Sequence, residues 1–130
     1  MPSAADDIAS GVMAKWAAAF SKFDTDAQAS LYSKNALFFG SKPTLYRGQD
    51  GVASYFNGLQ KWRSRSVQFS EVVTVPVNPD LINVAGIANF VIDEGATNLS
   101  VKITWVIARE DGDWKIVSHH VSSKAPLLAP

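Results

Sequence analysis

The chain has 130 residues, the usual length of one domain, and its 12 basic and 12 acidic side chains form no long run of one sign, which argues against a nucleic-acid partner. It has no cysteine, which excludes disulfides, thiolate metal sites and cysteine nucleophiles. It also has neither a signal-peptide pattern nor an apolar stretch near the ~18 residues of a membrane span, so we expect a cytoplasmic protein with no membrane partner.

Helical periodicity dominates the first part of the chain. Apolar residues recur every three to five positions over residues 8–23, which predicts one long helix, and Ser3 with Asp6 fits a capping box at its start. A second, shorter helix is expected over residues 24–32, ending at 33–35. A third helix is predicted by the apolar stripe Val52, Tyr55, Phe56, Leu59 and Trp62.

After Ser64 the hydrophobic period changes from 3.6 to 2, which is typical of strands. We expect strands at 67–75, 82–92, 99–109 and 114–121, in addition to a short hairpin of 36–39 with 44–46. Asp111-Gly112 predicts a tight turn, and Arg63 and Arg65 fall in a loop where solvent exposure is the simplest expectation. Helices followed by a meander of strands predict an α+β fold with an antiparallel sheet. We expect residues 1–130 to form a single domain, with a loose tail at about 123–130.

Several short stretches, taken in order, carry a family resemblance across nearly the whole chain. They are residues 16–20 with Asp24, residues 31–36, residues 46–48, Tyr55-Phe56, residues 109–116 and residues 120–122. In this order and spacing they resemble the NTF2-like superfamily, and most closely its SnoaL-like members and the association domain of calcium/calmodulin-dependent kinase II. The resemblance implies an NTF2-like cone, in which three N-terminal helices pack on a strongly curved antiparallel sheet with a ligand pocket at its open end.

Comparison with two relatives narrows the function that the resemblance implies. Ketosteroid isomerase needs a tyrosine, an aspartate base and a protonated carboxylic acid, and the matching positions here are Trp16, about Gly40, and Trp105-Val106. No Asp or Glu lies between Asp26 and Asp50, so we expect no isomerisation by that mechanism. In the association domains an arginine lies near the position of Trp105, so their anionic-ligand pocket is not expected here.

Six residues are candidates for the lining of the pocket. They are Trp16, Phe38, Tyr55, Asn89, Trp105 and Ser118. Trp16 is the strongest of them, because the matching helix position faces the cavity in relatives. The alternative for the aromatic residues is ordinary core packing. The alternative for Asn89 is an amide that is hydrogen-bonded within the protein.

The two histidines are neighbours on one predicted strand, so they point to opposite faces and cannot chelate one metal ion. We expect no metal site. Strict alternation places His120 on the face of Ile116 and Ser118, and the resemblance puts that face toward the pocket. His120 is therefore the candidate general acid or base. The alternative is a histidine held at a sheet face or dimer contact, and His119 is expected at the surface or an interface.

Two functions fit these observations. The first is a module that binds a small organic ligand in a largely apolar pocket and forms a homodimer through the open face of the sheet. The alternative is a small enzyme of the isomerase, cyclase or dehydratase kind that uses His120, and a partner-binding domain is a third possibility. No cofactor is expected, because neither a dinucleotide fingerprint nor a flavin motif is present.

Overall fold

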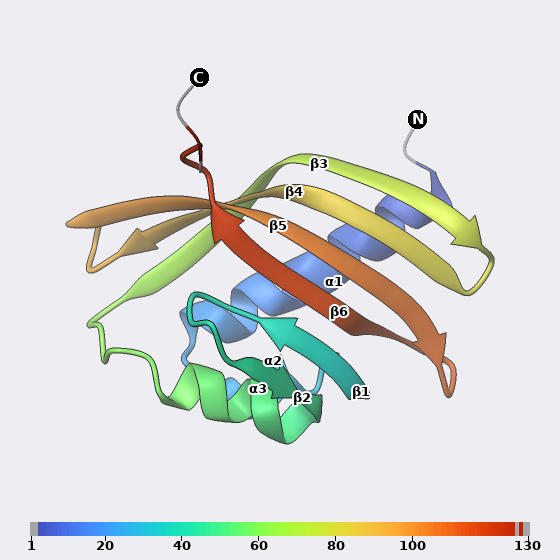
Figure 1. Cartoon of the computed structure of the whole chain (residues 1–130), viewed down its shortest axis with the longest axis horizontal. Helices are drawn as coiled ribbons and strands as arrows, with labels where there is room; N and C mark the ends of the chain where they lie inside the picture. Colours follow the sequence, from blue (N-terminus) through green and yellow to red (C-terminus); the bar gives the residue numbers. More distant parts are fainter. Residues whose placement is uncertain (1–2, 127, 129–130) are drawn as a thin grey trace.

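The computed structural model describes residues 3–126 and 128, and within them it contains three helices and one six-stranded sheet (Figure 1). The helices are α1 (Ala4–Ser21), α2 (Thr25–Ala29) and α3 (Gly48–Asn57). The strands are β1 (Tyr32–Phe39), β2 (Leu45–Arg47), β3 (Arg65–Asn78), β4 (Leu81–Ile92), β5 (Thr97–Glu110) and β6 (Asp113–Ser123). The fold is thus α+β, with helices packed on a curved sheet, although α2 has only five residues.

The strands follow the order β2-β1-β6-β5-β4-β3, and every neighbouring pair is antiparallel except β1 and β6, which run parallel. The expected second helix over residues 24–32 is too long, because α2 ends at Ala29 and β1 begins at Tyr32. The backbone N–H of Ile116 donates to the Leu31 carbonyl at 2.9 Å, which starts the parallel pairing directly after the helix. This long-range contact turns the expected local hairpin into part of one continuous sheet.

Helix α1 lies along the inner, concave side of the sheet, where it packs mainly against β3 (Figure 1). Its buried residues recur at helical spacing: Ala5, Ala9, Val12, Met13, Trp16, Ala19 and Phe20. The predicted capping box between Ser3 and Asp6 is present, and Asp6 also accepts a hydrogen bond from the Thr74 hydroxyl of β3. These contacts fix the rotation of α1, so that Trp16 points toward the inner face of the sheet.

Arg65 holds the other end of α1, and its expected exposure in a loop is wrong. Its Nε donates to the Phe20 carbonyl at 2.6 Å, and its guanidinium lies over the rings of Phe20 at 4.2 Å and Phe23 at 4.3 Å. A cation at a helix C-terminus complements the helix dipole. Here it adds a side-chain donor to a carbonyl whose backbone partner, the Phe23 N–H at 3.2 Å, lies beyond the end of the helix. The side chain is buried because it performs this structural role.

A β-bulge in β6 decides which histidine faces α1. Val106 pairs with Ser118 while the adjacent Ile107 pairs with Ile116, so Val117 is an extra residue that reverses the alternation of faces. His119 is consequently buried at 5% exposure on the inner face, while His120 is exposed on the outer face, where its ring lies 5.7 Å from that of Phe39. The expectation that His120 points into the pocket and His119 out of it is therefore wrong.

Two predictions remain to be compared with the structure, the absence of a membrane span and the loose C-terminal tail. The described part of the chain has no helix that is long and apolar enough to cross a membrane. Of the predicted tail at 123–130, Ser123 still belongs to β6, and residues 127, 129 and 130 lie outside the described residues.

Candidate ligand-binding site

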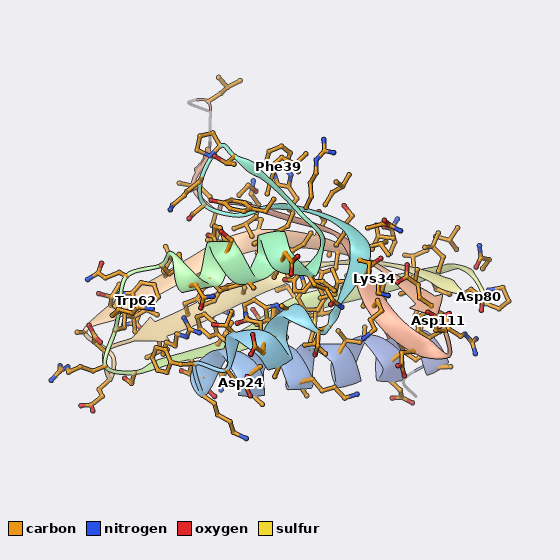
Figure 2. The ribbon with its side chains drawn as sticks, turned by 90° about the horizontal axis from the view of Figure 1, so that it is seen from below. Asp24, Lys34, Phe39, Trp62, Asp80 and Asp111 are labelled. Carbon is orange, nitrogen blue, oxygen red and sulfur yellow. The ribbon has the colours of Figure 1, made fainter. Side chains whose placement is uncertain are left out.

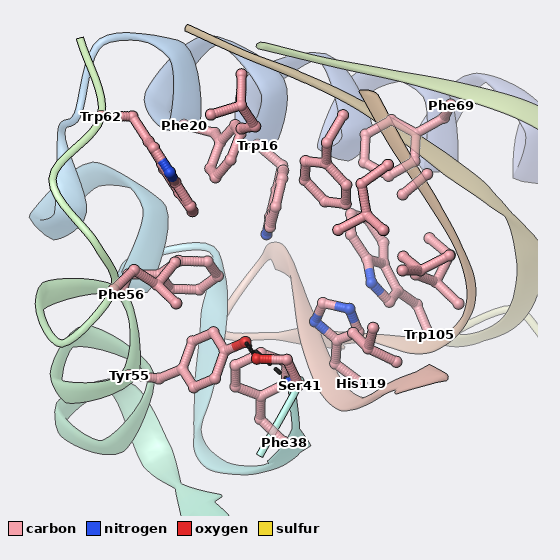
Figure 3. A pocket seen from close by; sticks show the side chains of 18 of the residues that line it. Trp16, Phe20, Phe38, Ser41, Tyr55, Phe56, Trp62, Phe69, Trp105 and His119 are labelled. Carbon is pink, nitrogen blue, oxygen red and sulfur yellow. Dashed lines mark hydrogen bonds between the residues drawn. The ribbon is translucent and has the colours of Figure 1, made fainter. Parts of the chain in front are cut away.

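An apolar cavity of about 200 Å³ lies between α1, α3 and the inner face of the sheet (Figure 3). Trp16 and Phe20 reach it from α1, and Tyr55 and Phe56 reach it from α3. Trp62, in the segment between α3 and β3, also lines it and lies at the end of the molecule opposite the turns of Asp80 and Asp111 (Figure 2). No charged side chain is among the residues that line this cavity.

The sheet forms the floor of the cavity because strand alternation directs every second residue inward. These inward residues are Ala88, Phe90 and Ile92 of β4, Thr97, Leu99, Val101, Ile103 and Trp105 of β5, and His119 and Val121 of β6. Ala88 is fully buried and carries only a methyl group. A small side chain at this point of the floor leaves space that larger neighbours do not fill.

Tyr55 closes one wall through its contacts with the loop after β1. Its hydroxyl accepts a hydrogen bond from the Ser41 backbone N–H at 2.9 Å and shares another with the Ser41 hydroxyl at 2.7 Å. A Cβ atom on Gly40 would lie only 2.4–2.6 Å from atoms of the Tyr55 side chain, so this position must be glycine for Tyr55 to pack there. The position matched to the aspartate base of ketosteroid isomerase therefore has no room for a side chain.

Trp16, Tyr32 and His119 form a buried chain of hydrogen bonds at the deep end of the cavity. The indole N–H of Trp16 donates to the Tyr32 hydroxyl at 3.0 Å, and that hydroxyl lies 2.8 Å from Nδ1 of His119. An indole N–H can only donate, so the Tyr32 oxygen accepts from it. The buried Tyr32 O–H has no acceptor among the described residues other than Nδ1 of His119, so it donates to that nitrogen. Because Nδ1 accepts this hydrogen bond, a neutral His119 ring carries its proton on Nε2.

Burial keeps both titratable members of the chain neutral. Desolvation, with a smaller contribution from His120, lowers the pKa of His119 from 6.5 to about 3, and desolvation raises the pKa of Tyr32 above its usual value of 10. At neutral pH His119 is therefore an uncharged imidazole with its basic nitrogen already occupied. It presents an N–H donor to the cavity, as a neutral histidine does when it polarises a carbonyl group.

Trp105 stands beside His119 and is the second polar group at this end. The two residues are cross-strand neighbours on β5 and β6, and their ring centroids lie 5.4 Å apart. Trp105 is 1% exposed, and its indole N–H has no hydrogen-bond partner among the residues that the structure describes. In the part of the chain that the structure describes, no group of three potential ligand side chains is placed to hold a metal ion.

The structure brings together four of the six predicted lining residues, Trp16, Phe38, Tyr55 and Trp105. Asn89 does not line the cavity, because its amide is satisfied on the other face by the Gln68 carbonyl at 3.1 Å and the hydroxyls of Ser70 and Ser100 at 2.8 and 2.7 Å. Ser118 is exposed on that outer face, next to the bulge.

Sequence reasoning missed two central residues, Tyr32 and His119. Tyr32 was assigned to the end of a helix. For His119 a signal existed: alternation counted forward from Ile116 places His120 inside, whereas alternation counted back from Val121 places His119 inside. Ile116 and Val121 both face inward in the structure. Two inward-facing residues of one strand lie an odd number of positions apart only if a bulge lies between them, so the two counts together indicated the bulge.

The SnoaL-like domain family matches residues 10–126, which is most of the chain. The chain belongs to the SnoaL-like domain family. A comparison of this SnoaL-like domain with curated proteins gives no match.

Solved structures share the fold of this SnoaL-like domain at low sequence identity. A candidate scytalone dehydratase of Novosphingobium aromaticivorans matches with a TM-score of 0.82 and 14% identity over 92% of this chain and 83% of its own. A candidate calcium/calmodulin-dependent protein kinase II association domain of Xanthomonas campestris has a TM-score of 0.80 and 18% identity over 92% of this chain and 87% of its own. An NTF2-like protein of Pseudomonas putida has a TM-score of 0.81 and 14% identity over 95% and 89%. They establish the NTF2-like fold.

The buried neutral imidazole predicts a specific dependence of stability on pH. Between about pH 3 and 6.5, His119 is neutral in the folded protein and protonated in the unfolded chain. The stabilisation that comes from burying the neutral ring is therefore complete above pH 6.5 and is lost as the pH falls toward 3. Relative to a His119→Phe variant, we expect the wild-type free energy of unfolding to fall by up to about 1.4 kcal/mol per pH unit below pH 6. Urea denaturation at pH 7, 6, 5 and 4 measures this difference.

The control is His120→Phe, which makes the same chemical change at the exposed neighbour. Because burial of His119 is the larger cause of its lowered pKa, this variant should still lose stability as the pH falls. Parallel profiles for the wild type and His119→Phe would contradict the neutral, buried state of His119.

Proposed function

We propose that this SnoaL-like domain binds a small, largely apolar organic molecule in the cavity beside α1. The observation that carries the proposal is the lining, which combines aromatic rings from α1, α3 and the sheet with no charged group. Such a concave apolar site with a few convergent polar groups is the usual form of a small-molecule pocket. A cavity of about 150 Å³ in another protein holds benzene, so about 200 Å³ is suited to a compact ring compound.

The position of His120 does not support the alternative function, an enzyme that uses this residue as general acid or base. His120 is exposed on the outer face of the sheet and does not line the cavity. His119 does line it, but its Nδ1 is occupied by Tyr32 and burial disfavours its charged form. One structural neighbour is a candidate scytalone dehydratase, yet none of the described residues that line this cavity carries a carboxylate to act as a base. Binding is therefore the better supported function.

Filling the cavity tests the proposal. In an Ala88→Leu variant the added isopropyl group points into the cavity from its floor, so we expect the affinity for tetralin (1,2,3,4-tetrahydronaphthalene) to fall at least tenfold. Isothermal titration calorimetry and tetralin-observed NMR measure the dissociation constants. The matched control is Ala85→Leu, which adds the same group to the exposed outer face of the same strand.

The proposal is wrong if folded wild-type protein binds no tetralin, or if Ala88→Leu and Ala85→Leu bind it equally well. A circular dichroism spectrum and a cooperative unfolding transition establish that each variant is folded.

We further propose that the partner of the outer sheet face is a second copy of this chain. That face carries exposed apolar side chains on separate strands, including Leu37 and Phe39 of β1, Val73 and Val75 of β3 and Val91 of β4. The helices pack on the opposite, inner face (Figure 1). Exposed apolar patches of this kind mark interaction surfaces, and a twofold dimer buries such a patch against itself.

Sedimentation velocity at micromolar concentration should give a species of twice the 14.0 kDa chain mass. Leu37→Lys places a charge on the outer face, where Leu37 is 48% exposed, and should shift the protein to the monomer. The control is Leu99→Lys, because Leu99 is 55% exposed but lies on the inner face, so the dimer should persist. A wild-type protein that sediments only as a monomer would overturn this part of the proposal.

A further inference from the structure

We propose that the ligand is a neutral carbonyl compound whose oxygen accepts a hydrogen bond from Nε2–H of His119, with the indole N–H of Trp105 as a second donor beside it. This inference rests on the proposed function, because it requires a molecule in the cavity. The apolar lining alone specifies no polar group on the ligand. The inference specifies a carbonyl group and places it at His119.

The first step is the direction of the His119 ring. Tyr32 donates to Nδ1, so the opposite nitrogen carries the proton, and His119 is among the residues that line the cavity. Phe38 stacks on the same imidazole at a centroid distance of 4.6 Å. The ring is therefore held both by a hydrogen bond and by packing, and no other hydrogen bond in the described residues uses Nε2.

The second step is the unpaired N–H of Trp105. Buried polar groups nearly always have a hydrogen-bond partner, so an exception in a cavity wall needs an explanation. The pairing of Trp105 with His119 across β5 and β6 puts both rings at the same deep end of the cavity, as Figure 3 shows. The indole nitrogen itself is buried, so the proposal requires the indole ring to rotate for its N–H to reach an oxygen bonded to His119.

The third step is the kind of oxygen that fits two donors. A buried water needs two to four partners, including acceptors for its own protons. The hydroxyls of Tyr55 and Ser41 are bonded to each other, and Thr97 is exposed. A carbonyl oxygen has two lone pairs and no proton to place, so it satisfies both donors without needing an acceptor.

The fourth step excludes anions. No Lys or Arg lines the cavity, and burial strongly disfavours a positive charge on His119. A carboxylate or phosphate in this position would be a buried charge without a partner, which is strongly unfavourable. The ligand class is consequently a neutral ketone, aldehyde, ester or amide on an apolar ring system.

The experiment compares 1-tetralone with tetralin, which has the same bicyclic skeleton without the carbonyl oxygen. For each protein variant, calorimetry gives the ratio of the tetralin dissociation constant to the tetralone dissociation constant. The different hydration of the two probes cancels when this ratio is compared between variants. We expect His119→Phe to lower the ratio roughly tenfold, as loss of one or two hydrogen bonds predicts, and Trp105→Phe to lower it by a smaller factor.

The matched control is His120→Phe, which should keep the wild-type ratio. In the wild type, the carbonyl ¹³C resonance of labelled 1-tetralone and the indole N–H resonance of Trp105 should both move on binding, and tetralin should leave the indole resonance nearly in place. This second measurement decides the question if a substituted chain does not fold.

A ratio that is unchanged in His119→Phe, or a wild-type carbonyl resonance that stays at its value in water while the probe is bound, would overturn the inference and leave the apolar pocket intact. Absence of binding by both probes would overturn the proposed function and this inference together.

Discussion

The hydrogen bond from the Tyr32 hydroxyl to Nδ1 of His119 is the interaction on which the chemistry of the cavity depends. It joins the first residue of β1 to β6 across 87 positions of the chain, and Trp16 of α1 completes it by donating to the same hydroxyl. The three elements that enclose the deep end of the cavity therefore meet at one oxygen atom. Loss of that oxygen would leave the Trp16 N–H and Nδ1 of His119 as buried groups without partners, which is unfavourable.

This bond also sets the character of the site. A histidine in a cleft is usually a candidate proton carrier, but this one is buried, neutral and oriented with its basic nitrogen away from the cavity. No charged side chain is among the described residues of the lining, and a side chain at Gly40 would collide with Tyr55, so no carboxylate is placed at the cavity as a proton acceptor. An apolar cavity with neutral N–H donors at its closed end is better suited to holding a molecule than to moving its protons.

Much of the fold follows from local patterns in the sequence. The capping box at Ser3, the apolar stripe of α1 and the alternation in β3 to β6 predict these elements to within a few residues. The parallel pairing of β1 with β6 has no local signal, because it depends on residues far apart in the chain. The inserted Val117 shows in the sequence only as the conflict between alternation counted from Ile116 and alternation counted from Val121, and one extra residue exchanges His119 and His120 between the faces of the sheet. Four aromatic lining residues were thus predicted from the sequence and its family resemblance, whereas Tyr32 and His119 take their places from the parallel pairing and the bulge.

The tautomer of His119 is the most direct test of this account, and ¹⁵N NMR of the two ring nitrogens measures it in the free protein. We predict a neutral ring with a protonated, pyrrole-type Nε2 and an unprotonated, pyridine-type Nδ1 at pH 7, with no change when the pH is lowered to 5. A ring that carries its proton on Nδ1, or that becomes an imidazolium between pH 7 and 5, would contradict the account, because His119 would then present a different group to the cavity.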